Sequence, residues 1–96
     1  MNVKNMTGNR PPSCKCSSHS QHWLKANNRR TLGTCSRLGC SNPAYLGGHV
    51  INCHGNAKNS WKITPLCSSC NSISVSICYA LKTGANPVLV TDTRAC

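Results

Sequence analysis

The sequence predicts a small α+β domain that depends on a staple, meaning a metal or disulfide cross-link, as well as on its hydrophobic core. At 96 residues the chain is one domain at most. A chain of this length buries only roughly 60% of the surface that its unfolded form exposes. Its aromatic content is low, with no Phe, two Trp and two Tyr, whereas it has nine cysteines. We therefore expect the cysteines to hold together a fold that apolar burial alone would not stabilise.

Two cysteine pairs in the middle of the chain have the spacing of a tetrahedral metal site. Cys35 and Cys40 form the first pair, and Gly39 lies where a tight knuckle turns backbone amides toward sulfur. Cys67 and Cys70 form the second pair. Because zinc accepts four thiolates at about 2.3 Å, we expect these four cysteines to hold a structural Zn²⁺ ion. The alternative is two disulfides in a small secreted protein.

The segments around these pairs predict short elements. Residues 1–17 are rich in Asn, Pro, Ser and Gly and are expected to form an extended arm, whereas 18–30 predicts a short helix. Residues 71–81 fit the period of a strand and that of a helix. The preceding cysteine pair and Gly84 favour the helix, which would bury Cys78 as a small apolar side chain. Strands are expected at 43–51, 61–64 and 88–90.

The charge balance of the chain is extreme. Eleven Lys and Arg residues face one acidic residue, and the formal net charge is +10. Four thiolates around Zn²⁺ would leave a charge of about +8. Such a surface suits a polyanion, and nucleic acid is the commonest one, although anionic membranes or glycans satisfy the same electrostatics. We expect nucleic acid, DNA rather than RNA, with phosphate contacts from Arg29, Arg30, Arg37, Lys58 and Lys62.

Three motifs follow one another in the centre of the chain. They are Cys35-Ser-Arg-Leu-Gly-Cys40, Gly47-Gly48-His49-Val50 and Ile63-Thr-Pro-Leu-Cys67-Ser-Ser-Cys70-Asn71. In this order they resemble the HNH, or ββα-metal, zinc proteins of the treble-clef class. The resemblance implies a knuckle, a β-hairpin and a helix within residues 35–84, between an N-terminal arm at 1–34 and a tail at 85–96. It also implies that His49 is a general base in phosphodiester hydrolysis and that Asn71 binds a second, catalytic divalent metal.

Other residues favour a binding module over a working nuclease. Gly48 stands where many family members carry an Asp metal ligand, and Lys62 stands where they carry the Asn that orients the base. Magnesium prefers carboxylate oxygens, but the only side-chain carboxylate, Asp92, lies far along the chain. A zinc module that binds nucleic acid is therefore the leading expectation. A metal-dependent endonuclease that uses His49 is the first alternative.

Five further cysteines leave other roles open. Cys14 and Cys16, together with His19 and His22, have the donor types of a second zinc site. Because five is an odd number, at least one of these cysteines is free, shared or linked to another chain. A homo-oligomer, or a structural subunit of a larger assembly or filament, is thus a further alternative. In an oxidising compartment Cys14 or Cys16 would instead pair with one of the remaining three, Cys53, Cys78 and Cys96.

Targeting features point to the cell interior if the chain is full length. No apolar run approaches the roughly 18 residues of a membrane span. The polar residues 1–10 lack the apolar stretch of a secretory signal. Inside the cell, reduced thiols favour metal over disulfide. If the chain is a mature fragment, an extracellular location stays open.

Overall fold

A five-stranded antiparallel sheet runs through the protein. The computed structural model describes residues 1–6, 16–54 and 61–92. The sheet has the strand order β4-β1-β2-β3-β5. Two helices, α1 (His19–Ala26) and α2 (Ser68–Asn71), accompany it within the described residues, and neither is long and apolar enough to cross a membrane. The strands are β1 (Asn2–Asn5), β2 (Leu46–Asn52), β3 (Lys62–Leu66), β4 (Tyr79–Ala80) and β5 (Val88–Leu89).

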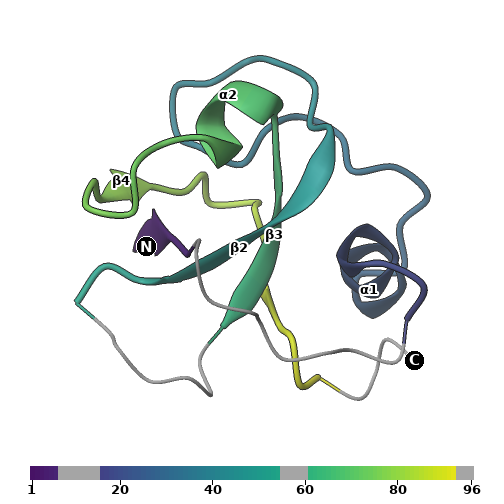
Figure 1. Ribbon diagram of the computed structural model, residues 1–96. Coiled ribbons are helices and arrows are strands. Elements are labelled where there is room, and N and C mark those ends of the chain that lie inside the picture. The colour runs from purple at the N-terminus through teal and green to yellow at the C-terminus, as the bar shows by residue number, and fades with distance from the viewer. Residues whose placement is uncertain (7–15, 55–60, 93–96) are drawn as a thin grey trace.

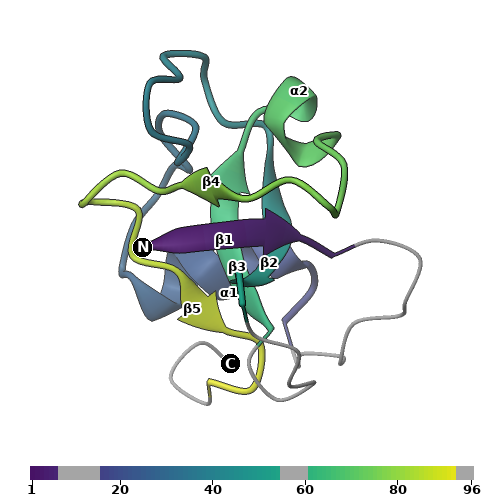
Figure 2. The same ribbon diagram turned by 90° about the vertical axis from the view of Figure 1, so that its left-hand side faces the viewer.

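The β2–β3 hairpin separates two small cores. Side chains alternate between the two faces of a strand, so neighbours along β2 enter different cores. Figure 1 shows α1 beside the hairpin, and Figure 2 shows β1 and β4 on the side of the hairpin away from α1. The core on the α1 side contains Trp23, Ile51, Trp61, Ile63, Val88 and Val90. The other core contains Val3, Val50, Leu66, Tyr79, Leu81, Ala85, Cys35, Cys67 and Cys70.

Three sequence expectations about regular structure are confirmed. The segment 18–30 contains α1, whose N-cap is Ser18, with the side chain accepting a hydrogen bond from the backbone N–H of Gln21 at 3.1 Å. The expected hairpin strands correspond to β2 and β3, which pair from Leu46 opposite Leu66 to Val50 opposite Lys62. The expected last strand corresponds to β5.

The expectation of an N-terminal arm is wrong for the first six residues. β1 lies inside the sheet, paired with β2 on one side and with β4 on the other. Val3 is fully buried and Asn5 is 1% exposed. Asn has a low strand propensity, so the sequence around Val3 does not read as a strand. Pairing on both sides outweighs that propensity and places these residues in the same sheet as the cysteine module.

The expectation of a helix over 71–81 is also wrong. α2 ends at Asn71, and the chain then turns toward β4. The side-chain amide of Asn5 donates to the carbonyls of Cys70 and Ile73, which a continuing helix would have needed for its own backbone. Pairing of β4 with β1 therefore replaces the expected helix with a strand.

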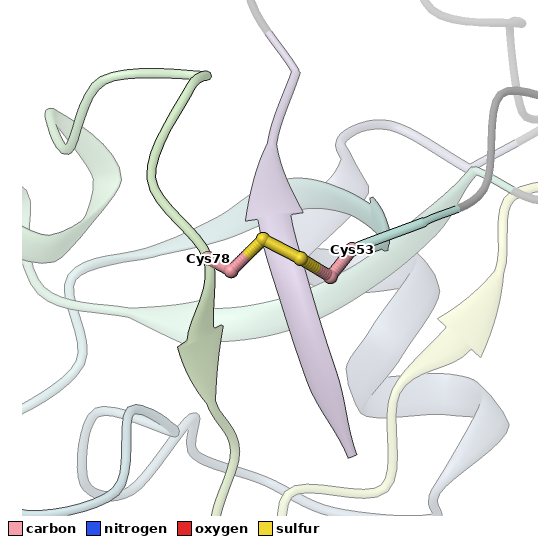
Figure 3. Close-up of a disulfide and its surroundings, with 2 residues drawn as sticks. All are labelled: Cys53 and Cys78. Atoms are coloured by element: carbon pink, nitrogen blue, oxygen red, sulfur yellow. A yellow bond between two sulfur atoms is a disulfide. The ribbon is translucent and has the colours of Figure 1, made fainter.

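Cys78 is exposed rather than buried, and it forms a disulfide with Cys53. Their Cα atoms are 5.6 Å apart, within the ordinary range for a disulfide. Cys53 follows β2 and Cys78 precedes β4, which are the two neighbours of β1. Figure 3 shows the disulfide passing across β1. The disulfide thus forms a covalent strap across β1, the strand that the sequence predicted to be part of an extended arm.

Candidate metal centre and basic surface

The four predicted metal-binding cysteines come together at one end of the hairpin. Their Sγ atoms all lie within 4.8 Å of one another, and none of the four is in a disulfide. A tetrahedral zinc site with bonds of about 2.3 Å has sulfur–sulfur edges of about 3.8 Å. The Sγ atoms of Cys40 and Cys67 are 3.9 Å apart, close to that edge. The cluster therefore fits a metal ion, and the alternative of two disulfides among these cysteines is not what the structure shows.

Two local structures position the sulfurs. Around the first pair the chain makes a tight turn in which the backbone N–H of Cys40 donates to the carbonyl of Arg37. Gly39 adopts a φ of 88°, which favours glycine at this position of the turn. In the second pair Cys67 is the N-cap of α2 and Cys70 lies within that helix. A knuckle and a helix start thus present two sulfurs each to a common point.

Burial and local hydrogen bonds separate the thiol pKa values. The backbone N–H of Cys70 is the main cause that lowers the pKa of Cys67 to about 6, because it stabilises the thiolate. Burial raises the pKa of Cys70 to about 12 and also raises the pKa of Cys35. A metal ion would have to displace protons from these buried thiols, so its binding would release protons and weaken at low pH.

Two cationic side chains lie close to the cysteine cluster. The guanidinium of Arg37 favours the thiolate of Cys70 and so opposes the effect of burial on the pKa of Cys70. The ammonium of Lys82 donates to the carbonyl oxygen of Cys40. Four thiolates around Zn²⁺ carry a net charge of about −2, which two nearby cations offset. Arg37, which was predicted to contact phosphate, therefore also offsets negative charge at the cysteine cluster.

Asn5 holds the end of α2 in place. Its Nδ2 atom donates to the carbonyl oxygens of Cys70 at 2.9 Å, Ile73 at 3.0 Å and Asn71 at 3.3 Å. Its Oδ1 atom accepts a hydrogen bond from the hydroxyl of Tyr79. Because Asn5 is buried, these bonds replace those it would make to water. Sequence reasoning missed this residue, since nothing near position 5 marks it as a partner of residues 65 or more positions away.

The residues predicted to be catalytic do not come together. Position 48 faces α2, because a Cβ built on Gly48 would lie 3.0 Å from Oδ1 of Asn71 and would collide with Leu66. The next residue, His49, points to the opposite face of β2. There its Nε2 atom lies 2.6 Å from Nδ1 of His19 in α1. His49 and Asn71 thus lie on opposite faces of the hairpin, and no common metal site includes them.

The two imidazoles form a contact between α1 and β2. The rings of His19 and His49 meet edge to face, with centroids 4.2 Å apart, and the Trp61 ring lies 6.1 Å from His49. Burial, and then the charge of His19, lowers the pKa of His49 to about 4. At neutral pH His49 is therefore an uncharged imidazole, and one N–H···N hydrogen bond joins the pair.

The predicted second zinc site is not assembled among the described residues. Cys16 is disulfide-bonded, so its sulfur is not a thiolate in this structure. His19 contacts His49, while Nε2 of the buried His22 lies 3.0 Å from the carbonyl oxygen of Leu89. Cys14 and Cys96 lie outside the described residues. The disulfide accounts for the difference, because oxidation removes the donor that the site needs most.

The other predicted phosphate contacts are distributed around the end of α1 and the hairpin. Arg29 and Arg30 are exposed just after the end of α1, and Lys62 is half-buried at the start of β3. Lys58 lies outside the described residues. With a single acidic side chain in the whole chain, most of these cations have no acidic neighbour.

Comparisons with known proteins assign no family to the chain. No protein-family model, curated protein or solved structure matches it. Its function is therefore inferred from the residues themselves and from the geometry in which the fold places them.

Proposed function

We propose that the protein is a zinc-stabilised module that binds nucleic acid through phosphate contacts and does not cleave it. The observation that carries the proposal is a cluster of four unpaired thiols within 4.8 Å in a chain of formal charge +10. The cluster supplies the staple that a small core needs. The unneutralised cations supply the affinity for a polyanion.

The donor set supports zinc as the metal. Four sulfur donors in a compact arrangement suit Zn²⁺ or an iron–sulfur centre, and they do not suit magnesium or calcium, which prefer oxygen. The order of elements supports a treble-clef arrangement, since the knuckle at 35–40 is followed by the β2–β3 hairpin and then by α2. In this proposal the protein resembles HNH proteins in its scaffold and not in its catalytic site.

Two findings favour binding over hydrolysis. His49 and Asn71 occupy opposite faces of the hairpin, and the side chain of Leu66 already fills the space in front of Gly48. A ligand that entered at position 48 would therefore need the core to open. The alternative of a structural subunit linked through its cysteines stays a prediction. The Cys53–Cys78 disulfide is typical of proteins in oxidising compartments and therefore gives no support to an intracellular location. That location stays a prediction.

Metal content is the first test of the proposal. We expect the protein, purified without added chelator, to contain one zinc per chain by plasma mass spectrometry. The variant with Cys70→Ser should lose it, because a buried hydroxyl cannot replace the thiolate. A variant with Cys78→Ala is the matched control and should keep the metal. Protein that folds with no metal, or with iron in place of zinc, would contradict the zinc assignment.

Salt dependence tests the nucleic-acid part. The affinity for a fluorescent DNA duplex should fall linearly on a log–log plot as salt rises, with a slope of about −0.9 per neutralised phosphate. Combining Arg29→Ala with Arg30→Ala should reduce that slope by about 2. An affinity that does not change with salt would contradict phosphate contacts.

Plasmid incubated with Mn²⁺ or Ni²⁺ should remain intact, and cleavage abolished by His49→Ala would establish the nuclease instead.

A further inference from the structure

A cavity of about 230 Å³ lies between the end of α1, the segment before the knuckle and the segment after β4. Its lining includes Trp23, Arg29, Ser36 and Lys82. Two of the lining residues are cationic and none is acidic. The cavity is smaller than the roughly 300–1,000 Å³ of sites for drug-sized ligands, so it suits a small group.

Three side chains of the cavity lining carry hydrogen-bond donors. The guanidinium of Arg29 has five N–H groups, and the structure shows no hydrogen bond or ion pair for its side chain among the described residues. The ammonium of Lys82 donates one of its three N–H groups to Cys40, which leaves two. The buried hydroxyl of Ser36 accepts from Thr64 at 2.8 Å, so its own hydrogen remains a donor.

We propose that this cavity binds a phosphate group. A tetrahedral anion with several acceptor oxygens matches a small space whose lining residues carry a guanidinium, an ammonium and a hydroxyl. This inference adds a specific phosphate site to the proposed function. It rests on the proposed function where the phosphate belongs to nucleic acid. The phosphate comes either from a backbone diester or from a terminal monoester, and both present the same oxygens to the cavity.

The chain contains a matched control for this assignment. Arg29 and Arg30 are adjacent, both exposed and equally charged, but only Arg29 lines the cavity. A diffuse basic surface would treat the two residues alike. A phosphate site would distinguish them, because affinity there depends on direct hydrogen bonds rather than on net charge.

Inorganic phosphate is the probe for the first measurement. We expect saturable changes in the backbone amide NMR signals of Gly33, Thr34 and Ser36 in the folded, metal-loaded protein, with chloride at equal ionic strength as the reference. Arg29→Ala should weaken phosphate binding at least tenfold and Arg30→Ala less than twofold, with thermal melting confirming that both variants are folded. Equal weakening, or changes that spread over the surface without saturating, would overturn the proposal.

Oligonucleotides then identify the source of the phosphate. A 5′-phosphorylated single strand that loses affinity when its terminal phosphate is removed indicates a monoester, whereas unchanged affinity that still depends on Arg29 indicates a backbone diester. If phosphate saturates the cavity but no nucleic acid binds, the proposed function fails and the cavity assignment stands. If nucleic acid binds but Arg29→Ala and Arg30→Ala weaken the binding of inorganic phosphate equally, the cavity assignment fails and the proposed function stands.

Discussion

Asn5 shows how a single side chain connects the N-terminal strand to the cysteine cluster. It donates to carbonyls at the C-terminal end of α2, and that helix with its N-cap carries two of the four sulfurs. A buried polar group is stable only when its hydrogen bonds are made, and here every one of them crosses to a distant segment. Positioning of Cys70 therefore depends on residues near the first position of the chain.

Replacing Asn5 with Ala should destabilise the fold by roughly 2–4 kcal/mol, because it removes three hydrogen bonds to carbonyls at the end of α2 and leaves the buried Tyr79 hydroxyl without its partner. Urea denaturation of the metal-loaded protein measures the loss. Tyr79→Phe is the control, since it removes one hydrogen bond at a cost of about 1 kcal/mol. Equal losses in the two variants would show that the bonds from Asn5 to the α2 carbonyls contribute little.

The His19–His49 contact should make stability depend on pH. The pKa of His49 in the folded protein is about 4, below its ordinary value of 6.5. The unfolded chain therefore binds the proton more readily, and stability should fall as pH drops from about 6.5 toward 4. Melting temperatures across this range measure the effect. Release of metal also destabilises the protein in acid, so the control is His49→Asn, which should show a shallower fall. Parallel curves would exclude the imidazole pair as a cause.

At the scale of elements, β1 is held by three kinds of interaction. It pairs with a strand on each side, its Val3 side chain is fully buried, and the Cys53–Cys78 disulfide crosses it (Figure 3). The disulfide joins the segments that flank β1, so it restricts how far β4 and β2 can separate. We infer that it stabilises the sheet edge formed by β4, which has only two residues.

Removing this disulfide should weaken the fold without removing the metal. The bridge spans a sequence separation of 25 residues, for which the loop-entropy relation gives about 3.5 kcal/mol. Chemical denaturation of the variant combining Cys53→Ala with Cys78→Ala measures that loss, and zinc content should remain one per chain. Loss of zinc together with the disulfide would show that the strap and the cluster form a single cooperative unit.

At the scale of the whole molecule, the metal is expected to be the main staple. Two small cores, one on each face of the hairpin, replace the single large core of bigger domains. In the sequence, the knuckle precedes the β2–β3 hairpin and α2 follows it. The cysteine cluster joins these two segments. Metal binding is therefore expected to be coupled to folding, as in other small metal-binding domains.

Chelation should unfold most of the protein. Adding EDTA in excess should abolish the near-ultraviolet circular dichroism of the two tryptophans, both of which are buried, and zinc should restore it. The intact Cys53–Cys78 disulfide should remain under these non-reducing conditions, so the loss reports on the metal alone. A spectrum and melting temperature unchanged by complete metal removal would contradict a structural role for the ion.

Much of the candidate centre was predictable from the sequence because its information is local. Short spacing within each cysteine pair, with Gly39 in the turn, is enough to predict two ligand pairs. The same is true of α1 with its Ser18 cap, and of the two hairpin strands. The helix predicted for 71–81 failed because that segment fits two periods, and a distant strand, β1, decided between them.

The excess of positive charge, the two pairs of sulfur donors and the hairpin between them could be predicted, because they follow from composition and from short spacings. Three other features are set by folding: residues 2–5 form an internal strand, Cys53 bonds to Cys78, and His49 faces His19 rather than Asn71. Each of these depends on contacts between segments far apart in the chain. A one-residue step along a strand reverses the face of a side chain, so adjacency in a motif does not ensure adjacency in space.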